Sequence, residues 1–409
     1  RKNYFYPDLP KAYQISQYDL PLCEDGKLVI NLEGEEVEVG INRVHLEEDA
    51  GKLTHAGDIS NASYSLVDYN RCGTPLIEIV SEPDMESPAQ AVAYLKKLKS
   101  ILEYIEVSDC EMAEGSLRAD ANLSVAPQGA KELGTKTELK NMNSFKAIEK
   151  ALTYEARRQA KVLDEGGEIT QGTRTWDGEA GKTLSLREKE EAHDYRYFPE
   201  PDLVPLVIEE KWVKEIEQGL PELPYQKEKR FSEVYELPVY DAEILTENKD
   251  LADLFEEGVK VYNDPKEVSN WIMGEFLRLL NEEEIAVREA EVTGELLGKL
   301  LQMINDETIS SKIAKNVFEE MFKTGKDPEK IVEEKGLKQI SDEDQLEKIV
   351  NSIVTDNPDV VEDILNGKDK AIGFLVGQVM KETKGKANPQ MANQLIREKI
   401  NEKKENNND

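Results

Sequence analysis

The hydrophobic pattern changes along this chain, and that change constrains the fold more than any other feature. Up to about residue 207, short segments alternate between apolar and polar residues, as strands do when one face is buried, and they surround two helical patterns. From Thr293 onward the pattern is almost purely helical, with short helices separated by Gly or Asn-Pro breaks. We therefore expect an α+β fold, in which a mainly antiparallel sheet region precedes all-α regions.

The length requires more than one hydrophobic core. A chain of 409 residues exceeds the size at which single cores stop growing. The sequence predicts a sheet-containing domain over residues 1–220, a helical domain over 221–292 and a helical tail domain over 293–405. The chain opens on Arg1-Lys2-Asn3-Tyr4 without an initiator methionine, which is typical of the middle of a domain, so we expect an N-terminal truncation.

The composition predicts a soluble protein from a reducing compartment. No apolar run approaches the length of about 20 residues that a membrane-spanning helix needs. Cys23, Cys72 and Cys110 lie far apart and indicate neither a disulfide framework nor a zinc knuckle, so we expect a cytoplasmic location. The net charge of −32 opposes binding to nucleic acid unless a local basic patch is present.

Two helices are predicted from their end signals. Ser87 followed by Pro88 is typical of a helix N-terminus, and apolar residues then recur at helical spacing up to Ile105. The second helix is expected to begin near Ser144 and to end near Gly166, because glycine readily adopts the left-handed conformation that ends many helices.

Two segments with one polar face form the sharpest local signal. Apolar and polar side chains alternate over residues 116–125, and the alternation continues over 135–141 after a Gly-containing connection. If the two strands pair as a hairpin, one face displays Arg118, Asp120, Asn122, Lys136, Glu138 and Lys140. Such a face is either a solvated outer surface, which is the commoner case, or a site where carboxylates hold a metal ion and cations bind phosphates.

An acid inside an apolar run is the second candidate. Glu78 lies in a segment that we interpret as a buried strand, where an unpaired carboxylate costs several kcal/mol. We therefore expect Glu78 to meet a cation, with an Arg or Lys side chain and a metal ion as equal alternatives. Glu47, Glu48 and Asp49 end another strand-like segment, and they form either a solvated turn or, with Glu78, a magnesium site.

Two further segments combine tyrosines with charge. Residues 195–202 contain alternate prolines and form either a packed connector or a rigid loop that presents Arg196, Glu200 and Asp202 to a cleft. In the opening segment, lysines stand beside several tyrosines, so this segment is either the lining of a polar passage or a surface strand edge.

The tail carries a basic patch in an otherwise acidic chain. Lys381, Lys384 and Lys386 follow a helical segment, and they either stabilise its C-terminus or contact RNA phosphates. No Cys or Ser stands in a triad context, so a glutaminase activity is not expected. Gly181-Lys182-Thr183 is not a phosphate loop, because Trp176 occupies the position where that motif needs glycine.

Six segments together resemble the family of B subunits of the glutamyl-tRNA(Gln)/aspartyl-tRNA(Asn) amidotransferase. They occur in the family's order: 1–8, 45–52, 68–84, 114–122, 137–145 and 194–203. The resemblance extends from Arg1 to about Lys399. It implies a cradle-shaped, kinase-like domain, then a helical domain and a small helical tail.

The resemblance also implies an activity. Members of this family use ATP and Mg²⁺ to phosphorylate the side-chain carboxylate of Glu or Asp misacylated on tRNA(Gln) or tRNA(Asn). Ammonia from a partner amidase, the A subunit, then gives Gln-tRNA(Gln) or Asn-tRNA(Asn), and a small belt protein, the C subunit, completes a heterotrimer. Two alternatives stay open: a non-catalytic tRNA-binding or assembly subunit, and a stand-alone ligase that uses free ammonia.

The resemblance assigns candidate residues. Glu48 and Glu78 fall on magnesium positions, and Asp120 and Glu138 fall on acidic catalytic positions of the same pocket. It also places Lys2 and Lys11 near the ammonia route, where we expect Tyr4 as well. From the residues themselves we expect Arg196 as a further catalytic candidate and Lys381, Lys384 and Lys386 as the tRNA-binding candidates. The family's opening strand, which helps to build the metal site, has no counterpart here, so we expect this chain alone to be catalytically impaired.

Overall fold

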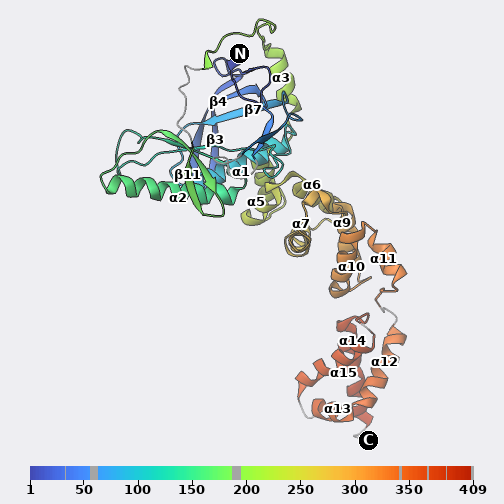
Figure 1. Cartoon of the computed structure of the whole chain (residues 1–409). Helices are drawn as coiled ribbons and strands as arrows, with labels where there is room; N and C mark the ends of the chain where they lie inside the picture. The colour runs from blue at the N-terminus through green and yellow to red at the C-terminus, as the bar shows by residue number, and fades with distance from the viewer. Residues whose placement is uncertain are drawn as a thin grey trace. The chain divides into compact units, whose positions relative to one another are not determined.

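The chain contains a sheet-rich part followed by a helical part (Figure 1). The computed structural model describes residues 1–32, 34–55, 63–186, 195–339, 343–365, 368–383 and 385–406. These residues divide into two compact units, Arg1–Pro221 and Glu222–Asp409. The α+β prediction is confirmed, whereas the cradle shape and the three domain boundaries stay predictions.

The first sheet of unit 1 is antiparallel throughout. Its strands β3 (Cys23–Leu32), β4 (Glu35–Glu48) and β7 (Pro75–Ser81) lie in the order β3-β4-β7. Helix α1 (Pro88–Tyr104) packs on one face, where a buried cluster joins side chains of the helix and the sheet. The predicted start of α1 is confirmed, because the Ser87 side chain accepts a hydrogen bond from the backbone N–H of Gln90.

Two short strand pairs flank this sheet. Strand β1 (Lys2–Asn3) pairs with β2 (Tyr13–Gln14), and β5 (Lys52–His55) pairs with β6 (Ser65–Asp68). An isolated bridge joins Ser16 to Glu47, so the opening segment is attached to the end of β4.

The second sheet contains both kinds of pairing. Its order is β11-β10-β9-β8, with bounds Lys182–Ser185, Gly172–Asp177, Thr137–Lys140 and Ala121–Leu123. The predicted hairpin is confirmed, because β8 and β9 are antiparallel with Asn122 opposite Glu138, although β8 begins only at Ala121. Strands β9 and β10 are parallel, which departs from the antiparallel expectation.

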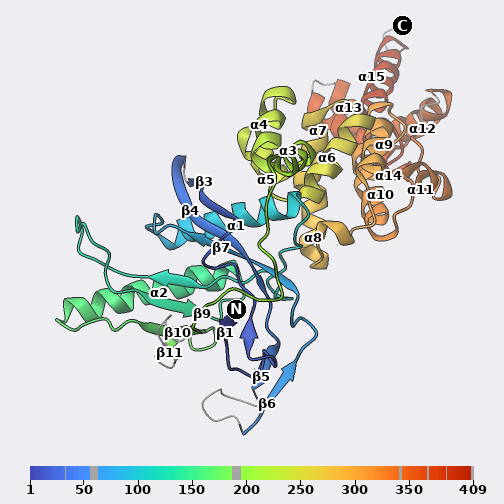
Figure 2. The same cartoon turned by 90° about the horizontal axis from the view of Figure 1, so that it is seen from above.

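The parallel pair follows from the helix that connects the two strands. Helix α2 (Phe145–Asp164) carries the chain back, so β10 runs in the same direction as β9. Figure 2 shows α2 beside these strands. Its predicted ends are confirmed: Ser144 caps the first turn, and Gly166 has a φ of 77° just beyond the last turn. Buried Leu139, Ile148 and Trp176 form part of the core between helix and sheet.

The remaining helices account for most of the chain beyond residue 209. Helix α3 (Glu210–Gly219) ends unit 1. Unit 2 begins with α4 (Pro224–Val234), α5 (Val239–Glu247), α6 (Lys249–Val261), α7 (Pro265–Trp271), a π-helical turn (Ile272–Phe276), α8 (Leu277–Glu283), α9 (Gly294–Asn305), α10 (Ser311–Thr324) and α11 (Pro328–Glu334).

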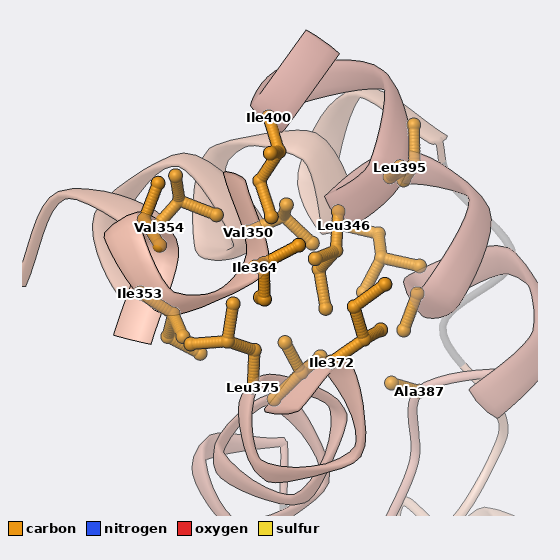
Figure 3. Packing of buried hydrophobic residues seen from close by; sticks show 14 residues of the cluster. Leu346, Val350, Ile353, Val354, Ile364, Ile372, Leu375, Ala387, Leu395 and Ile400 are labelled. Atoms are coloured by element: carbon orange, nitrogen blue, oxygen red, sulfur yellow. The ribbon is translucent and has the colours of Figure 1, made fainter. Parts of the chain in front are cut away.

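The tail helices share a hydrophobic cluster of their own. They are α12 (Glu343–Asp356), α13 (Pro358–Leu365), α14 (Ile372–Glu382) and α15 (Pro389–Asn406). Figure 3 shows how Leu346 and Val350 of α12, Leu375 of α14 and Ile400 of α15 approach one another, and all four are 3% exposed or less. The hydrophobic effect between amphipathic faces therefore holds this short-helix region together.

Candidate functional site

The end of β4 and the middle of β7 bring three possible metal ligands together. His45 pairs directly with Glu78 across the two strands. Glu47 lies two residues beyond His45, so it shares the same face of the sheet. Each of the three side chains offers one ligand atom, and these atoms lie within 4.8 Å of one another. The sequence had already indicated both acids, but it gave His45 no role.

The expectation that Glu78 is buried is wrong. Its side chain is 46% exposed. Ile41 packs against the α1 core and pairs with Ser81, so Ser81 lies on the face that α1 covers. Glu78 is three residues from Ser81 along β7 and therefore lies on the opposite face. An apolar run therefore does not mean burial on both faces here, because α1 covers only one of them.

Of the two partners expected for Glu78, the structure shows an arginine nearby and, for a metal ion, only a set of possible ligand atoms. The Arg43 guanidinium lies 3.9 Å from the Glu78 carboxylate, which is a long contact for an ion pair. His45 is fully buried; its Nε2 lies 3.3 Å from a Glu47 oxygen, and its Nδ1 has no hydrogen-bond partner among the residues that the structure describes. Two carboxylates suit Mg²⁺, and the imidazole also suits transition metals. The residues therefore fit a divalent cation.

A layer of tyrosines lies beside this cluster. The Tyr18 ring meets the His45 ring edge-on at 6.1 Å and stacks on Tyr197 at 5.2 Å. Burial, followed by the nearby Glu47 charge, raises the pKa of Tyr197 to about 12. Through Tyr18, the segment that begins at Tyr195 is thus packed beside the first sheet, and this packing fits a connector as well as a rigid loop.

Glu48 has a different set of neighbours. It accepts a hydrogen bond from the Lys11 ammonium and another, at 2.6 Å, from the backbone N–H of Ile15. Adjacent strand residues point to opposite faces, so Glu47, and not Glu48, joins the cluster with Glu78. The magnesium role predicted for Glu48 stays a prediction.

The residues expected near an ammonia route lie among aromatic rings. The Lys2 ammonium is 4.9 Å from the centre of the Tyr195 ring and 6.0 Å from that of Tyr4. The Lys11 ammonium is 4.6 Å from the centre of the Tyr13 ring. Burial, together with Asp8, raises the pKa of the Tyr4 hydroxyl. The predicted association of lysines with tyrosines is therefore present, and their role is untested.

The three charged residues of the 195–202 loop differ in their surroundings. The Arg1 guanidinium donates a 2.8 Å hydrogen bond to Glu200, and its hydrogen bonding lowers the pKa of that carboxyl to about 2. Asp202 lies 4.0 Å from Arg1. Arg196 is exposed with a φ of 46°, and its carbonyl accepts a hydrogen bond from the Asn3 side chain.

The polar face of the β8–β9 hairpin brings two predicted catalytic acids to one lysine. The Lys140 ammonium lies 2.6 Å from Asp120 and 3.5 Å from Glu138. Burial by itself lowers the pKa of Lys140, but the charges of Asp120 and Glu138 outweigh it and hold that pKa above its ordinary value. Thr173 also donates a 2.8 Å hydrogen bond to Glu138. On this face of the hairpin, two carboxylates are thus held around one ammonium group by ion pairs and a hydrogen bond.

Two of the three tail lysines lie at the end of α14. Lys381 is exposed in the last turn, and Lys386 is half-buried just beyond it. Lys384 lies outside the described residues.

The first and last parts of the chain match described families. Residues 1–214 match the GatB/GatE catalytic domain, and residues 253–400 match the GatB domain. A protein of Thermoanaerobacter sp. (strain X514), named as the B subunit of aspartyl/glutamyl-tRNA(Asn/Gln) amidotransferase, is 61% identical over 400 residues, which are 98% of this chain and 83% of that protein. This chain belongs to the family of amidotransferase B subunits.

Other relatives carry the same name. The protein of Carboxydothermus hydrogenoformans is 58% identical over 98% of the chain and 83% of its own length. That of Moorella thermoacetica is 57% identical over 98% of the chain and 84% of its own length. The predicted family membership is therefore confirmed. Among the described residues, no helix is both long enough and apolar enough to span a membrane.

Proposed function

We propose that this chain activates the side-chain carboxylate of Glu or Asp misacylated on tRNA, so that ammonia can convert it to the amide. The observation that carries the proposal is the convergence of His45, Glu47 and Glu78 within 4.8 Å, in a chain whose relatives are named tRNA amidotransferase subunits. The products would be Gln-tRNA(Gln) and Asn-tRNA(Asn).

The chemistry explains why a metal-binding surface is needed. A free carboxylate reacts poorly with ammonia, because oxide is a poor leaving group. Transfer of a phosphoryl group from ATP to the carboxylate supplies a good leaving group, and charge on the phosphates must be neutralised during that transfer. Mg²⁺, held by Glu47 and Glu78 with His45 beside them, would supply this neutralisation.

We assign the hairpin cluster to the same reaction. The Lys140 ammonium, between Asp120 and Glu138, provides a cation whose raised pKa keeps it protonated near neutral pH. A protonated lysine can bind a phosphate oxygen as a point charge. Asp120 and Glu138 would orient Lys140, and they could hold a second cation when the lysine turns toward phosphate. Arg196 would contact substrate from the neighbouring loop.

Ammonia would come from a partner amidase, because no acyl-transfer nucleophile is evident in the sequence. Lys2, Tyr4 and Lys11 would line its route, where a dry passage keeps ammonia unprotonated. The ion pair between Lys11 and Glu48 then lies on that route. A small belt protein would hold the two larger subunits together, and Lys381, Lys384 and Lys386 would bind the tRNA.

The test measures ATP hydrolysis with and without glutamyl-tRNA(Gln). It uses the chain extended to the length of its relatives and assembled with the amidase and belt proteins. Hydrolysis should depend on the charged tRNA, and Glu78→Gln should lower it by about 100-fold or more if the cation is lost. Glu36→Gln is the matched control, because Glu36 is an exposed acid of the same sheet, and it should hydrolyse ATP normally.

The alternative is a non-catalytic tRNA-binding or assembly subunit. An assembly subunit has no need for two acids and a histidine at ligand distance from one another. Absence of tRNA-dependent hydrolysis in the wild-type assembly would favour this alternative. Equal hydrolysis in wild type and Glu78→Gln would keep the activity and remove Glu78 from the site.

A further inference from the structure

A buried aspartate lies at the junction of the two larger sheets of unit 1. Asp49 directly follows β4 and is only 4% exposed, so it is not part of a solvated turn. It is also not among the three residues that offer ligand atoms to a cation, His45, Glu47 and Glu78, which we call the metal cluster. The other group of charges, the hairpin cluster, consists of Asp120, Glu138 and Lys140.

Two arginines bind the Asp49 carboxylate. The Nη2 of Arg71 donates a hydrogen bond to Oδ2 at 2.8 Å, and the Nη2 of Arg118 donates one to Oδ1 at 2.5 Å. A carboxylate that is 5% exposed is stable only when cations and hydrogen bonds replace its water. Both carboxylate oxygens of Asp49 are thus engaged by cations of this chain, which leaves Asp49 unsuited to bind a metal ion.

The Asp49 carboxylate connects three segments of the chain. The backbone N–H of Asp49 donates to the Thr74 carbonyl at 2.8 Å, which holds the end of β4 on the turn before β7. Arg71, in the same turn, also donates a 2.8 Å hydrogen bond to the Gly115 carbonyl. Arg118 lies in the segment that leads into β8 of the second sheet. The aspartate therefore fastens the segment before β8 to the end of β4.

This junction connects the two faces that carry the charged clusters. Ala119 packs toward the α2 core, so its neighbours Arg118 and Asp120 lie on the face that α2 does not cover. At the other end of the ion pair, Asp49 follows Glu47 of the metal cluster by two residues. A step of two residues spans about 7 Å in an extended chain, so each cluster begins about 7 Å along the chain from one end of the ion pair.

We propose that Asp49 is a positioning residue, whose ion pair with Arg118 fixes the place of the hairpin cluster relative to the metal cluster. Phosphoryl transfer requires the metal ion and the phosphate-binding cation to act on the same phosphates, and a displacement of about 1 Å can cost about 100-fold in rate. Asp49 acts through the two clusters and does not itself touch the substrate. This inference rests on the proposed function, because it assigns both clusters to one reaction.

The first test separates turnover from cation binding. Asp49→Asn keeps the size of the side chain and removes the charge that both arginines bind. In the assembled enzyme, this variant should lower kcat for tRNA-dependent ATP hydrolysis by about 10- to 100-fold. Its affinity for Mn²⁺, measured by electron paramagnetic resonance, should stay close to that of wild type, because the pairing of β4 with β7 holds the metal cluster. An unchanged kcat, or an equal loss of kcat and Mn²⁺ affinity, overturns the proposal.

The same region supplies a matched control. Asp68 is an exposed acid at the end of β6, and its carboxylate accepts hydrogen bonds from Asn70. Asp68→Asn makes the same chemical change close to the turn that contains Arg71, but it leaves the Asp49 carboxylate in place. This control should hydrolyse ATP like wild type. A loss of kcat as large as that in Asp49→Asn would show that any change of charge in this region suffices, and it would contradict the proposal.

Variants of Arg118 distinguish a tether from a local charge. Arg118→Ala should lower kcat less than Asp49→Asn does, because Arg71 still holds the Gly115 carbonyl, and Arg118→Lys should recover most of the loss. The double variant Asp49→Asn with Arg118→Ala should be no slower than Asp49→Asn alone, since both changes break one contact. Free guanidinium at a non-denaturing concentration should not restore Arg118→Ala. Restoration would mean that Arg118 acts as a charge on the reacting groups, and the tether would be wrong.

A distance measurement tests the junction without any need for activity. Nitroxide labels on exposed Cys23, at the start of β3, and on Lys136→Cys, just before β9, report the separation of the two sheets by double electron–electron resonance. Every other accessible cysteine is replaced by serine. The distance distribution should be broader in Asp49→Asn than in wild type or Asp68→Asn, and equal widths overturn the proposal. If the wild-type assembly hydrolyses no ATP with charged tRNA, the proposed function fails, while a broadened distribution still supports the junction.

Discussion

At the scale of single residues, the position of a side chain on its strand decides which acid can meet a metal ion. Glu47 and Glu48 are chemically identical neighbours, but they point to opposite faces of β4. Glu47 approaches His45 and Glu78, whereas Glu48 binds Lys11 and the backbone of Ile15. The resemblance pointed to Glu48, and the geometry favours Glu47.

This difference gives a direct prediction. Mn²⁺, used as a paramagnetic probe for the cation, should bind more weakly to Glu47→Gln than to wild type, by about 10- to 100-fold. Electron paramagnetic resonance of free Mn²⁺ measures the affinity without any need for activity. Glu48→Gln should have a smaller effect, because Glu48 points to the other face of β4 and is not part of the cluster. A larger loss in Glu48→Gln than in Glu47→Gln would restore Glu48 as the ligand.

At the scale of elements, a buried carboxylate joins α2 to the edge of the second sheet. Glu155 is 0% exposed and accepts hydrogen bonds from Arg158 at 2.6 Å and from the Thr183 hydroxyl at 2.8 Å. Gln159 donates to it at 3.1 Å, and Arg174 lies 3.4 Å away. The network holds the helix on the sheet whose parallel strands β9 and β10 it connects.

Removing the charge of Glu155 should therefore destabilise the first unit. Glu155→Gln leaves Arg158 and Arg174 without their carboxylate, and the loss of one partner from a buried pair costs about 3–5 kcal/mol. Urea unfolding should detect this loss as a lower midpoint. Glu149→Gln is the control, since Glu149 is exposed on the same helix, and it should unfold like wild type.

The same carboxylate predicts a pH dependence. Burial alone would raise the pKa of Glu155, but hydrogen bonds from Arg158, Thr183 and Gln159 outweigh burial and hold that pKa below the ordinary value of 4.5. The stabilisation is therefore present above pH 4.5 and is lost as the pH falls through the lower folded-state pKa. Unfolding measured between neutral pH and pH 3 should show a smaller acid-dependent loss in Glu155→Gln than in wild type. Equal losses would contradict the assignment.

At the scale of the whole molecule, a chain with a net charge of −32 must keep its RNA contacts local. The tail has its own buried cluster, so its surface can carry a basic patch without affecting the sheets. Lys381 and Lys386, near the end of α14, are the described members of the patch that we propose for tRNA.

Charge reversal tests this patch. Lys381→Glu with Lys386→Glu should weaken tRNA binding and reduce the slope of log affinity against log salt by up to about 2. The reason is that each lost lysine–phosphate contact leaves its counterions on the RNA when the protein binds. Filter binding over a range of salt concentrations measures both quantities. Lys348→Glu with Lys370→Glu changes the same charge elsewhere in the tail and should keep more of the slope. An unchanged slope in the first pair would count against the patch.

The sequence by itself determined the features that depend on neighbours along the chain. Ser87 and Ser144 cap helices because a side-chain oxygen satisfies backbone donors only three residues away. The alternation around Asp120, Glu138 and Lys140 predicted a shared face, because side chains of a strand alternate wherever the strand lies. The family followed from long motifs in order.

Only the tertiary structure decided the features that depend on what covers each face. Glu78 is exposed because α1 packs on one side of a three-stranded sheet, and no local pattern says how many layers a sheet has. The register of β4 and β7 shifts between Ile41 and Arg43, and this shift places His45 and Glu47 on the same face of the sheet as Glu78. The parallel pairing of β9 with β10 brings Trp176 to the start of α2, because strand neighbours are chosen by contacts between residues far apart in the chain.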